Sequence, residues 1–247
     1  MPNWVKTRIR VGKVETIKKM EELFIREDKS TNKKFFDLNT IEKMPDSLNV
    51  EFSTRADNAI TLFVAKIDPS IKNYGVNYKH PRVVKKIKNV LKNIAYRDVN
   101  PTEEEVSHLI EKYPTEEEQN KLFKLGKKQV ENLVNYGCIN WYDWRIKHWG
   151  TKWNTADTII DYDNNCIEFS TAWDSIQPLF EKISRMIGDA KIAILYADED
   201  IGYNQGYALL HNGTIDYQGS FENGSSDAQK LACDIWGIDY NTEYGQE

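Results

Sequence analysis

The chain has 247 residues, of which 40% are hydrophobic and 12% aromatic, so it can bury a sizeable core and is not expected to be disordered. Its formal net charge of −5 excludes a protein whose whole surface binds phosphate, although a local basic patch remains compatible with it. This length favours one domain with a large insertion.

The N-terminal residues predict a strand followed by a helix. The side chains of residues 4–11 alternate between a mostly apolar face and a mostly basic face, as in a half-buried strand. Apolar residues then recur at helical spacing through about residue 27. A second short strand is predicted near 35–38. The two faces of the first strand carry Val5, Thr7, Ile9 and Val11 on one side and Trp4, Lys6, Arg8 and Arg10 on the other.

Residues 55–137 form a block with helical patterning. The segments PTEEE and TEEE place a threonine N-cap and an acidic first turn at the start of two of its helices. We therefore expect an inserted helical subdomain over 55–137, between core segments 1–54 and 138–247. The helices predicted in this block span residues 56–67, 82–97, 102–113 and 115–136.

After residue 155 the strand pattern returns. Asn212-Gly213 is a strong hairpin signal between the last two predicted strands. Strands at both ends of the chain, separated by helices, indicate an α+β sandwich in which helices pack on one face of a mainly antiparallel sheet. The predicted strands are 157–162, 166–170, 190–197, 203–211 and 214–221, and the predicted helices are 173–187 and 226–236.

The segment NWYDWRIKHWGTKW, residues 140–153, concentrates aromatic side chains. On a helix over 139–149, one face would carry Trp141, Trp144 or Arg145, and His148. Large aromatic side chains at this density favour a packing role, in which the rings seat the helical block against the sheet. The alternative is a contact surface for a partner protein, because Trp, Tyr and Arg are enriched in such surfaces.

Two basic features are candidates for binding a charged partner. The segment 79–97 is the most basic in the chain, and its lysines would lie opposite a buried stripe. The strand face that holds Trp4, Lys6, Arg8 and Arg10 resembles a sheet that binds single-stranded nucleic acid. The lysines of the basic segment that could contact a partner are Lys85, Lys86, Lys88 and Lys92.

The sequence predicts no enzyme, cofactor or metal site. The four histidines are scattered, the acidic run at 198–200 is not part of a calcium loop, and no catalytic motif is found. Three widely spaced cysteines and a charged N-terminus favour a reducing cytoplasm, and the longest apolar run, at 60–67, is too short for a membrane span.

Four motifs resemble the YubB-type ferredoxin-like domain family, which includes proteins of phages and plasmids and phytoplasma antigenic proteins. The resemblance implies a ferredoxin-like core and a mobile-element origin, and it brings no catalytic residues. On this basis we expect a cytoplasmic, non-enzymatic protein that binds a host protein, such as a CRISPR nuclease of bacterial defence. The alternative is a single-stranded nucleic-acid-binding protein. The motifs are MPNW at the N-terminus, HWGTKW at 148–153, IEFSTAWDSIQP at 167–178 and YADEDIGYNQGYALLHNG at 196–213.

Overall fold

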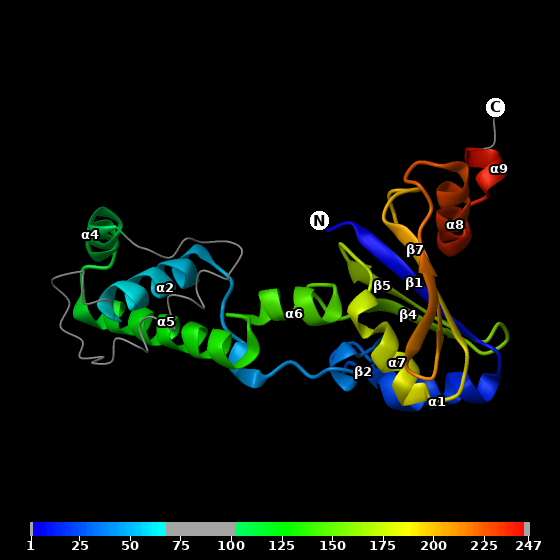
Figure 1. The fold of residues 1–247 in the computed structure, drawn as a ribbon, viewed down its shortest axis with the longest axis horizontal. Helices are drawn as coiled ribbons and strands as arrows, with labels where there is room; N and C mark the ends of the chain where they lie inside the picture. The colour runs from blue at the N-terminus through cyan, green and yellow to red at the C-terminus, as the bar shows by residue number, and fades with distance from the viewer. Residues whose placement is uncertain (1, 68–101, 245–247) are drawn as a thin grey trace. The chain divides into compact units, whose positions relative to one another are not determined.

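The computed structural model describes residues 2–67 and 102–244. They form two compact units, which we describe separately (Figure 1). Unit 1 consists of Met1–Lys43 and Arg145–Glu247, and unit 2 of Met44–Trp144. The helix predicted at 82–97, with Lys85, Lys86, Lys88 and Lys92, lies outside the described residues.

Unit 1 is built on a six-stranded sheet with the order β4-β5-β1-β6-β7-β8, in which every neighbouring pair is antiparallel. Strands β1, β4, β5 and β6, with one helix after β1 and one after β5, follow the βαββαβ order of a ferredoxin-like domain. The predicted fold class is therefore confirmed. The strands are β1 (Trp4–Val11), β4 (Ala156–Asp161), β5 (Cys166–Ala172), β6 (Ile192–Asp198), β7 (Gln205–His211) and β8 (Thr214–Gly219).

The core of unit 1 lies on the face of β1 that carries Val5 and Ile9, both fully buried. Helices α1 (Val14–Phe24) and α7 (Phe180–Ile187) pack on this side, where Phe180 lies 6.4 Å from Tyr196 of β6 between ring centroids. Alternation along the strands sends Lys6, Arg8 and Arg10 to the other face. The predicted strand-helix start is thus confirmed, except that the helix ends at Phe24 and residues 25–27, predicted as its last turn, form a short strand.

Helix α8 (Ser226–Trp236) packs on the second face of the sheet, whereas the sequence suggested helices on one face only (Figure 1). Helix α8 packs there because it carries an apolar stripe of its own. Ala232 and Ile235 of α8 are buried against Ala197 of β6, on the face that Arg8 shares. The second face is therefore partly covered from within unit 1.

The turns follow from local chemistry. Asn212 and Gly213 both have positive φ, 49° and 81°, as a two-residue hairpin turn requires, so this predicted hairpin is confirmed.

The helix predicted over 173–187 is shorter than expected. A 3₁₀ turn, η3 (Gln177–Leu179), precedes α7, which begins only at Phe180.

Smaller elements complete unit 1. The hairpin of β2 (Ile25–Glu27) and β3 (Lys34–Phe36) lies beside β4, where the Phe36 N–H donates to Thr158 Oγ1 at 3.0 Å. A 3₁₀ turn, η1 (Leu38–Thr40), follows β3, and a short helix, α9 (Tyr240–Glu243), follows α8.

Unit 2 is helical. Thr102 and Thr115 each form a complete capping box at the start of α4 and α5, which confirms the two predicted N-caps. Helices α2 and α5 pack closely at Gly126, where an added Cβ would lie 2.1 Å from the carbonyl oxygen of Ala59. The elements are η2 (Asp46–Leu48), α2 (Thr54–Ile67), α4 (Glu103–Lys112) and α5 (Glu116–Tyr136), and the boundary between the units falls within α6 (Trp141–Trp149).

Candidate binding site: a tryptophan cluster beside an acidic surface

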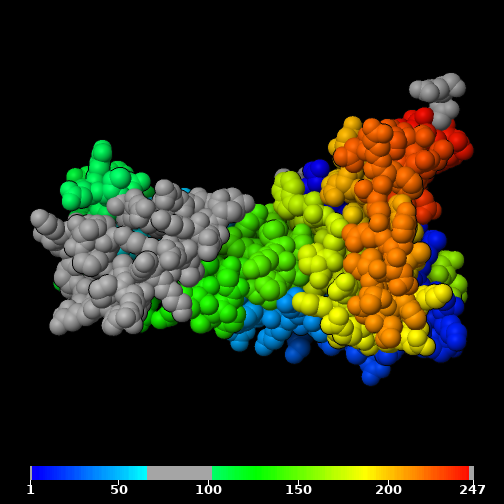
Figure 2. Space-filling model, in the orientation of Figure 1, coloured from blue at the N-terminus to red at the C-terminus, as the bar shows by residue number. Residues whose placement is uncertain are grey.

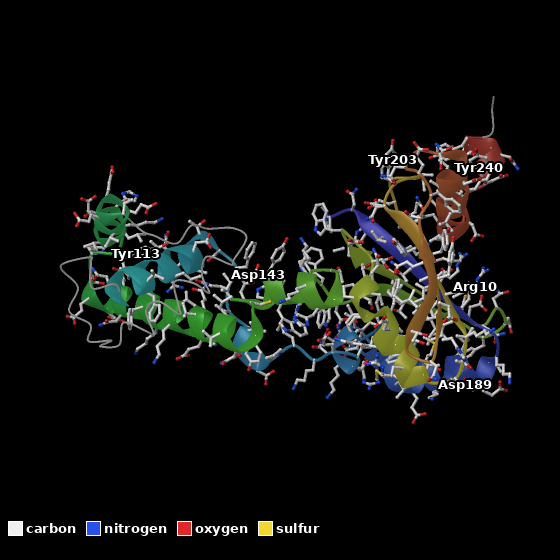
Figure 3. All side chains as sticks on the ribbon, in the orientation of Figure 1. Arg10, Tyr113, Asp143, Asp189, Tyr203 and Tyr240 are labelled. Atoms are coloured by element: carbon white, nitrogen blue, oxygen red, sulfur yellow. The ribbon has the colours of Figure 1, made fainter. Side chains whose placement is uncertain are left out.

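The cationic strand face predicted on β1 is largely used in folding. Arg8 is 9% exposed, and its guanidinium bonds the carboxylates of Glu168 and Asp234 and, at 3.0 Å, the Asp234 carbonyl oxygen of α8. Lys6 Nζ lies 4.6 Å from the ring centroid of Trp236. Arg10 is exposed near the far end of the strand (Figure 3). Because Arg8 is neutralised, these residues do not form a continuous basic strip.

The ring-rich segment contributes mainly to packing. Trp149 is fully buried, and its Nε1–H donates to the Glu42 carbonyl oxygen at 2.9 Å. Trp144 is 3% exposed. The Arg145 guanidinium stacks 4.9 Å from the Trp149 ring centroid, and burial lowers the pKa of Arg145.

The other two predicted contact residues of this segment are also engaged. His148 Nδ1 lies 2.9 Å from Glu42 Oε1, and Lys182 binds the second oxygen of the same carboxylate. Trp141 packs edge-on against Tyr142, with 5.7 Å between ring centroids. Such contacts indicate that the segment stabilises its surroundings, and they leave little of it free to anchor a partner.

A second group of tryptophans in unit 1 includes two exposed indoles and one that is partly buried. We call Trp4, Lys152, Trp153 and Trp173 the tryptophan cluster. Trp153 is 39% and Trp173 50% exposed, and Trp4 lies 6.3 Å from Trp153 between ring centroids. Lys152 Nζ lies 4.0 Å from the ring centroid of Trp153 and 5.3 Å from that of Trp173. Exposed indoles at this density are unusual and typical of a binding surface.

Trp173 is held in a strained backbone conformation. Its φ is +74°, a region that bulky L-residues rarely adopt and that costs about 1–3 kcal/mol. The Trp173 N–H donates to the Asn3 carbonyl oxygen at 2.9 Å, and the Asn204 side-chain amide donates to the Trp173 carbonyl oxygen at 3.1 Å. This conformation directs a large apolar side chain towards solvent. Sequence periodicity gives no signal for it, because periodicity does not report φ.

Two carboxylates support the backbone beside Trp173. Asp198 is 5% exposed and accepts hydrogen bonds from the Asn3 and Asn204 amides, each at 3.4 Å. Asp174 follows Trp173 directly. Burial raises the pKa of Asp174, and the negative charge of Asp198 adds to this effect. The base of the tryptophan cluster is therefore electronegative.

The C-terminal part of unit 1 is strongly acidic. Residues 189–244 contain ten Asp or Glu against two Lys and no Arg, a net charge of −8. We call their exposed carboxylates the acidic surface; they lie on or next to β6, β7, β8, α8 and α9. The later of these elements form a continuous orange-to-red area in Figure 2. The exposed residues are Asp189, Glu199, Asp200, Asp216, Glu222, Asp227, Asp234, Asp239 and Glu243.

Large apolar side chains are interspersed with these carboxylates. Tyr203 is 47%, Leu209 49% and Tyr217 56% exposed. Tyr203 lies near one end of unit 1 and Asp189 near the other, so the acidic surface extends along the unit (Figure 3). Carboxylates mixed with tyrosines are suited to a basic protein surface, because the rings supply contact area and the charges supply complementarity.

Unit 2 carries a basic counterpart. Lys124, Lys127 and Lys128 of α5 line a groove of about 440 Å³ together with Ser47 and Asn132. Asn132 is 2% exposed, and its amide is held by the carbonyl oxygen of Ser47 at 2.9 Å. Lys127 is also paired with Glu131 at 3.7 Å, so the positive charge of the groove is partly offset.

Two further features are absent from residues 2–67 and 102–244. No helix in this part of the chain combines the length and apolar character that a membrane span needs. Within the same residues, no three side chains of His, Cys, Asp or Glu are grouped closely enough to hold a metal ion.

Comparison with known proteins supports the fold of unit 1. Residues 148–239 match the ferredoxin-like domain in Api92-like protein. The ferredoxin-like domain implied by the resemblance is thereby confirmed. A crystal structure of the protein Api92 from Yersinia pseudotuberculosis matches 91% of this chain and 100% of that chain, at 12% identity and a TM-score of 0.39, which is too weak a likeness to carry an argument. No curated protein matches the sequence significantly.

Proposed function

We propose that the protein acts without catalysis, by stoichiometric binding to another protein whose contact surface is basic. The observation that carries this proposal is the acidic surface, which exposes nine carboxylates in a segment, residues 189–244, that contains two lysines and no arginine. A surface with charge of one sign accelerates association with a partner of the opposite charge and repels partners of the same charge. This acidic surface therefore repels nucleic acid, which is negatively charged.

The acidic surface also carries the contact area that a stable complex needs. Exposed Tyr203, Leu209 and Tyr217 lie among its carboxylates, and Tyr207 stacks on Tyr217 at 5.7 Å between ring centroids. Rigid rings lose little conformational entropy when they are covered. Charge would then determine which partner is recognised, and the apolar side chains would contribute to affinity.

Proteins that bind nucleic acid expose basic surfaces of this complementary kind. We therefore propose a bacterial nucleic-acid-binding protein as partner, and inhibition of a defence nuclease such as a CRISPR effector as the biological outcome. The phage or plasmid origin that this requires is supported by the resemblance to YubB-type proteins, and the cytoplasmic location by the three widely spaced cysteines. Occlusion of a nucleic-acid-binding surface would need no catalytic residue.

The test compares two variants with the same change in net charge. The acidic-surface variant carries Asp189→Asn, Asp200→Asn, Asp216→Asn and Glu222→Gln. The control carries Glu15→Gln, Glu22→Gln, Asp163→Asn and Glu181→Gln, which are exposed residues of unit 1 outside the acidic surface. Proteins captured from nuclease-treated bacterial lysate are identified, purified and titrated against both variants and the wild type.

We expect a basic partner whose affinity falls at least about fourfold in the acidic-surface variant, since each of four exposed ion pairs contributes about 0.2–1 kcal/mol. The control should bind like the wild type, and raising the salt concentration should weaken the wild-type complex. Equal affinities of the two variants would refute the proposal.

The second candidate function is binding of single-stranded nucleic acid, and the lysine groove of α5 is the feature of the described residues that favours it. Replacement of Lys124, Lys127 and Lys128 by Met should then strongly weaken binding of a poly-dT oligonucleotide and reduce the salt dependence of the binding that remains. Retention of oligonucleotide binding by this variant would exclude the groove as the site.

A further inference from the structure

We propose that the tryptophan cluster is a binding site for an arginine side chain of the partner protein, and that Lys152 occupies this site in the unbound protein. The inference rests on the proposed function, because it takes the partner to be basic. It adds a defined contact that the acidic surface alone does not provide, namely a choice between arginine and lysine.

The position of Lys152 shows that the rings accept a cation. Its ammonium lies 4.0 Å from the Trp153 ring centroid and 5.3 Å from that of Trp173, within the roughly 6 Å over which a cation–π interaction acts. Among the described residues, no carboxylate forms an ion pair with Lys152, and its ammonium makes cation–π contacts with these two indoles. A guanidinium is planar and more weakly hydrated than an ammonium, and it stacks better on an indole face.

The rings are presented before any partner binds. Trp173 is half exposed at φ +74°, and hydrogen bonds to Asn3 and Asn204 hold its backbone there. Strain of this kind persists only where the surroundings impose it, and it is concentrated at binding and catalytic sites. A preformed site avoids the entropy of ordering two large side chains on binding.

The charges around the cluster favour a cation over an anion. Asp174 and Asp198 lie beside the Trp173 backbone, and their mutual repulsion contributes to the raised pKa of Asp174. Glu199 follows Asp198, and its N–H donates to the Trp4 carbonyl oxygen at 2.9 Å. An incoming guanidinium would reduce this repulsion, whereas a phosphate would increase it. Stacked nucleobases with phosphates are therefore the less favoured ligands.

The test uses nona-arginine and nona-lysine peptides, which carry the same number of side-chain charges, and follows tryptophan fluorescence and calorimetric binding. Three single variants are compared with the wild type: Trp173→Leu, which keeps apolar area but removes the indole, Lys152→Met, which keeps the apolar stem but removes the cation, and Lys147→Met. Lys147 is an exposed lysine outside the cluster and controls for the change in net charge. Circular dichroism verifies that each variant is folded.

We expect the wild type to bind nona-arginine about threefold or more tightly than nona-lysine. Trp173→Leu should abolish this preference, because it should lower nona-arginine affinity by more than nona-lysine affinity. Lys152→Met should increase nona-arginine affinity by more than Lys147→Met does, because only the former empties the site. Equal affinities of the wild type for the two peptides would overturn the proposal.

A loss of nona-arginine affinity in Lys152→Met would also overturn it, because Lys152 would then support the site and not occupy it. Binding of poly-dT that depends on Lys152 would overturn it as well, because Lys152 would then bind an anion. The acidic-surface variant separates this inference from the proposed function. If that variant binds both peptides like the wild type while Trp173→Leu loses the arginine preference, the role proposed for the acidic surface is refuted and the arginine site is supported.

Discussion

Arg8 is the residue whose replacement tests the packing of α8 on the sheet. Its side chain is 10% exposed and bridges Glu168, which is 18% exposed, and Asp234, which is 59% exposed. Arg8→Met preserves most of the apolar stem but leaves the Glu168 carboxylate without its cation. It also removes the donor to the Asp234 carbonyl oxygen near the C-terminal end of α8.

The expected loss of stability comes mainly from the ion pair of Arg8 with Glu168, because both side chains are largely buried. Breaking a buried ion pair from one side costs about 3–5 kcal/mol, because the remaining charge stays desolvated. The pair with Asp234 adds little, since that carboxylate is largely hydrated. We therefore expect unfolding free energy to fall by about 3 kcal/mol, equivalent to a decrease in Tm of roughly 6–12 °C for a chain of this size.

The assay is urea denaturation followed by tryptophan fluorescence, to which Trp236, beside Lys6 on the same face of the sheet, contributes. Arg10→Met is the matched control, because Arg10 shares the strand and the face but is exposed. The double variant Arg8→Met with Glu168→Leu should recover most of the loss, since no unpaired carboxylate remains. A single-variant loss below about 1 kcal/mol, or a double variant that is less stable than the single one, would refute the reasoning.

Two further predictions concern local packing and pH. Gly126→Ala should lower the Tm of unit 2, followed by circular dichroism, because the new Cβ meets the Ala59 backbone at 2.1 Å; an unchanged or raised Tm would mean that helix propensity outweighs this clash. Hydrogen bonds from Lys182 and His148 outweigh burial and lower the pKa of Glu42, so its stabilisation is present at neutral pH and is lost as pH falls below about 4. Glu42→Gln should accordingly be less stable than the wild type at pH 7 and equally stable at low pH, and a difference in urea midpoint that does not change with pH would contradict this.

Local patterns in the sequence determine much of the secondary structure. The alternation from Trp4 to Val11 specifies a half-buried strand. Asn212-Gly213 specifies the hairpin turn between β7 and β8, because both residues tolerate positive φ. Thr102 and Thr115 set the starts of two helices through hydrogen bonds that span three residues. Each of these interactions is local, so the sequence contains the whole of its physical cause. Strands and helices in this order then indicate the ferredoxin-like class.

Tertiary structure decided which of the candidate side chains are available for binding. Arg8 has the sequence context of an exposed cation, but α8, more than 200 residues later in the chain, brings Asp234 against it and neutralises it. Trp149 and Trp173 are equally apolar in sequence, yet one is fully buried and the other half exposed. Burial and backbone strain depend on contacts between distant segments, and a periodicity over neighbouring residues contains no information about them.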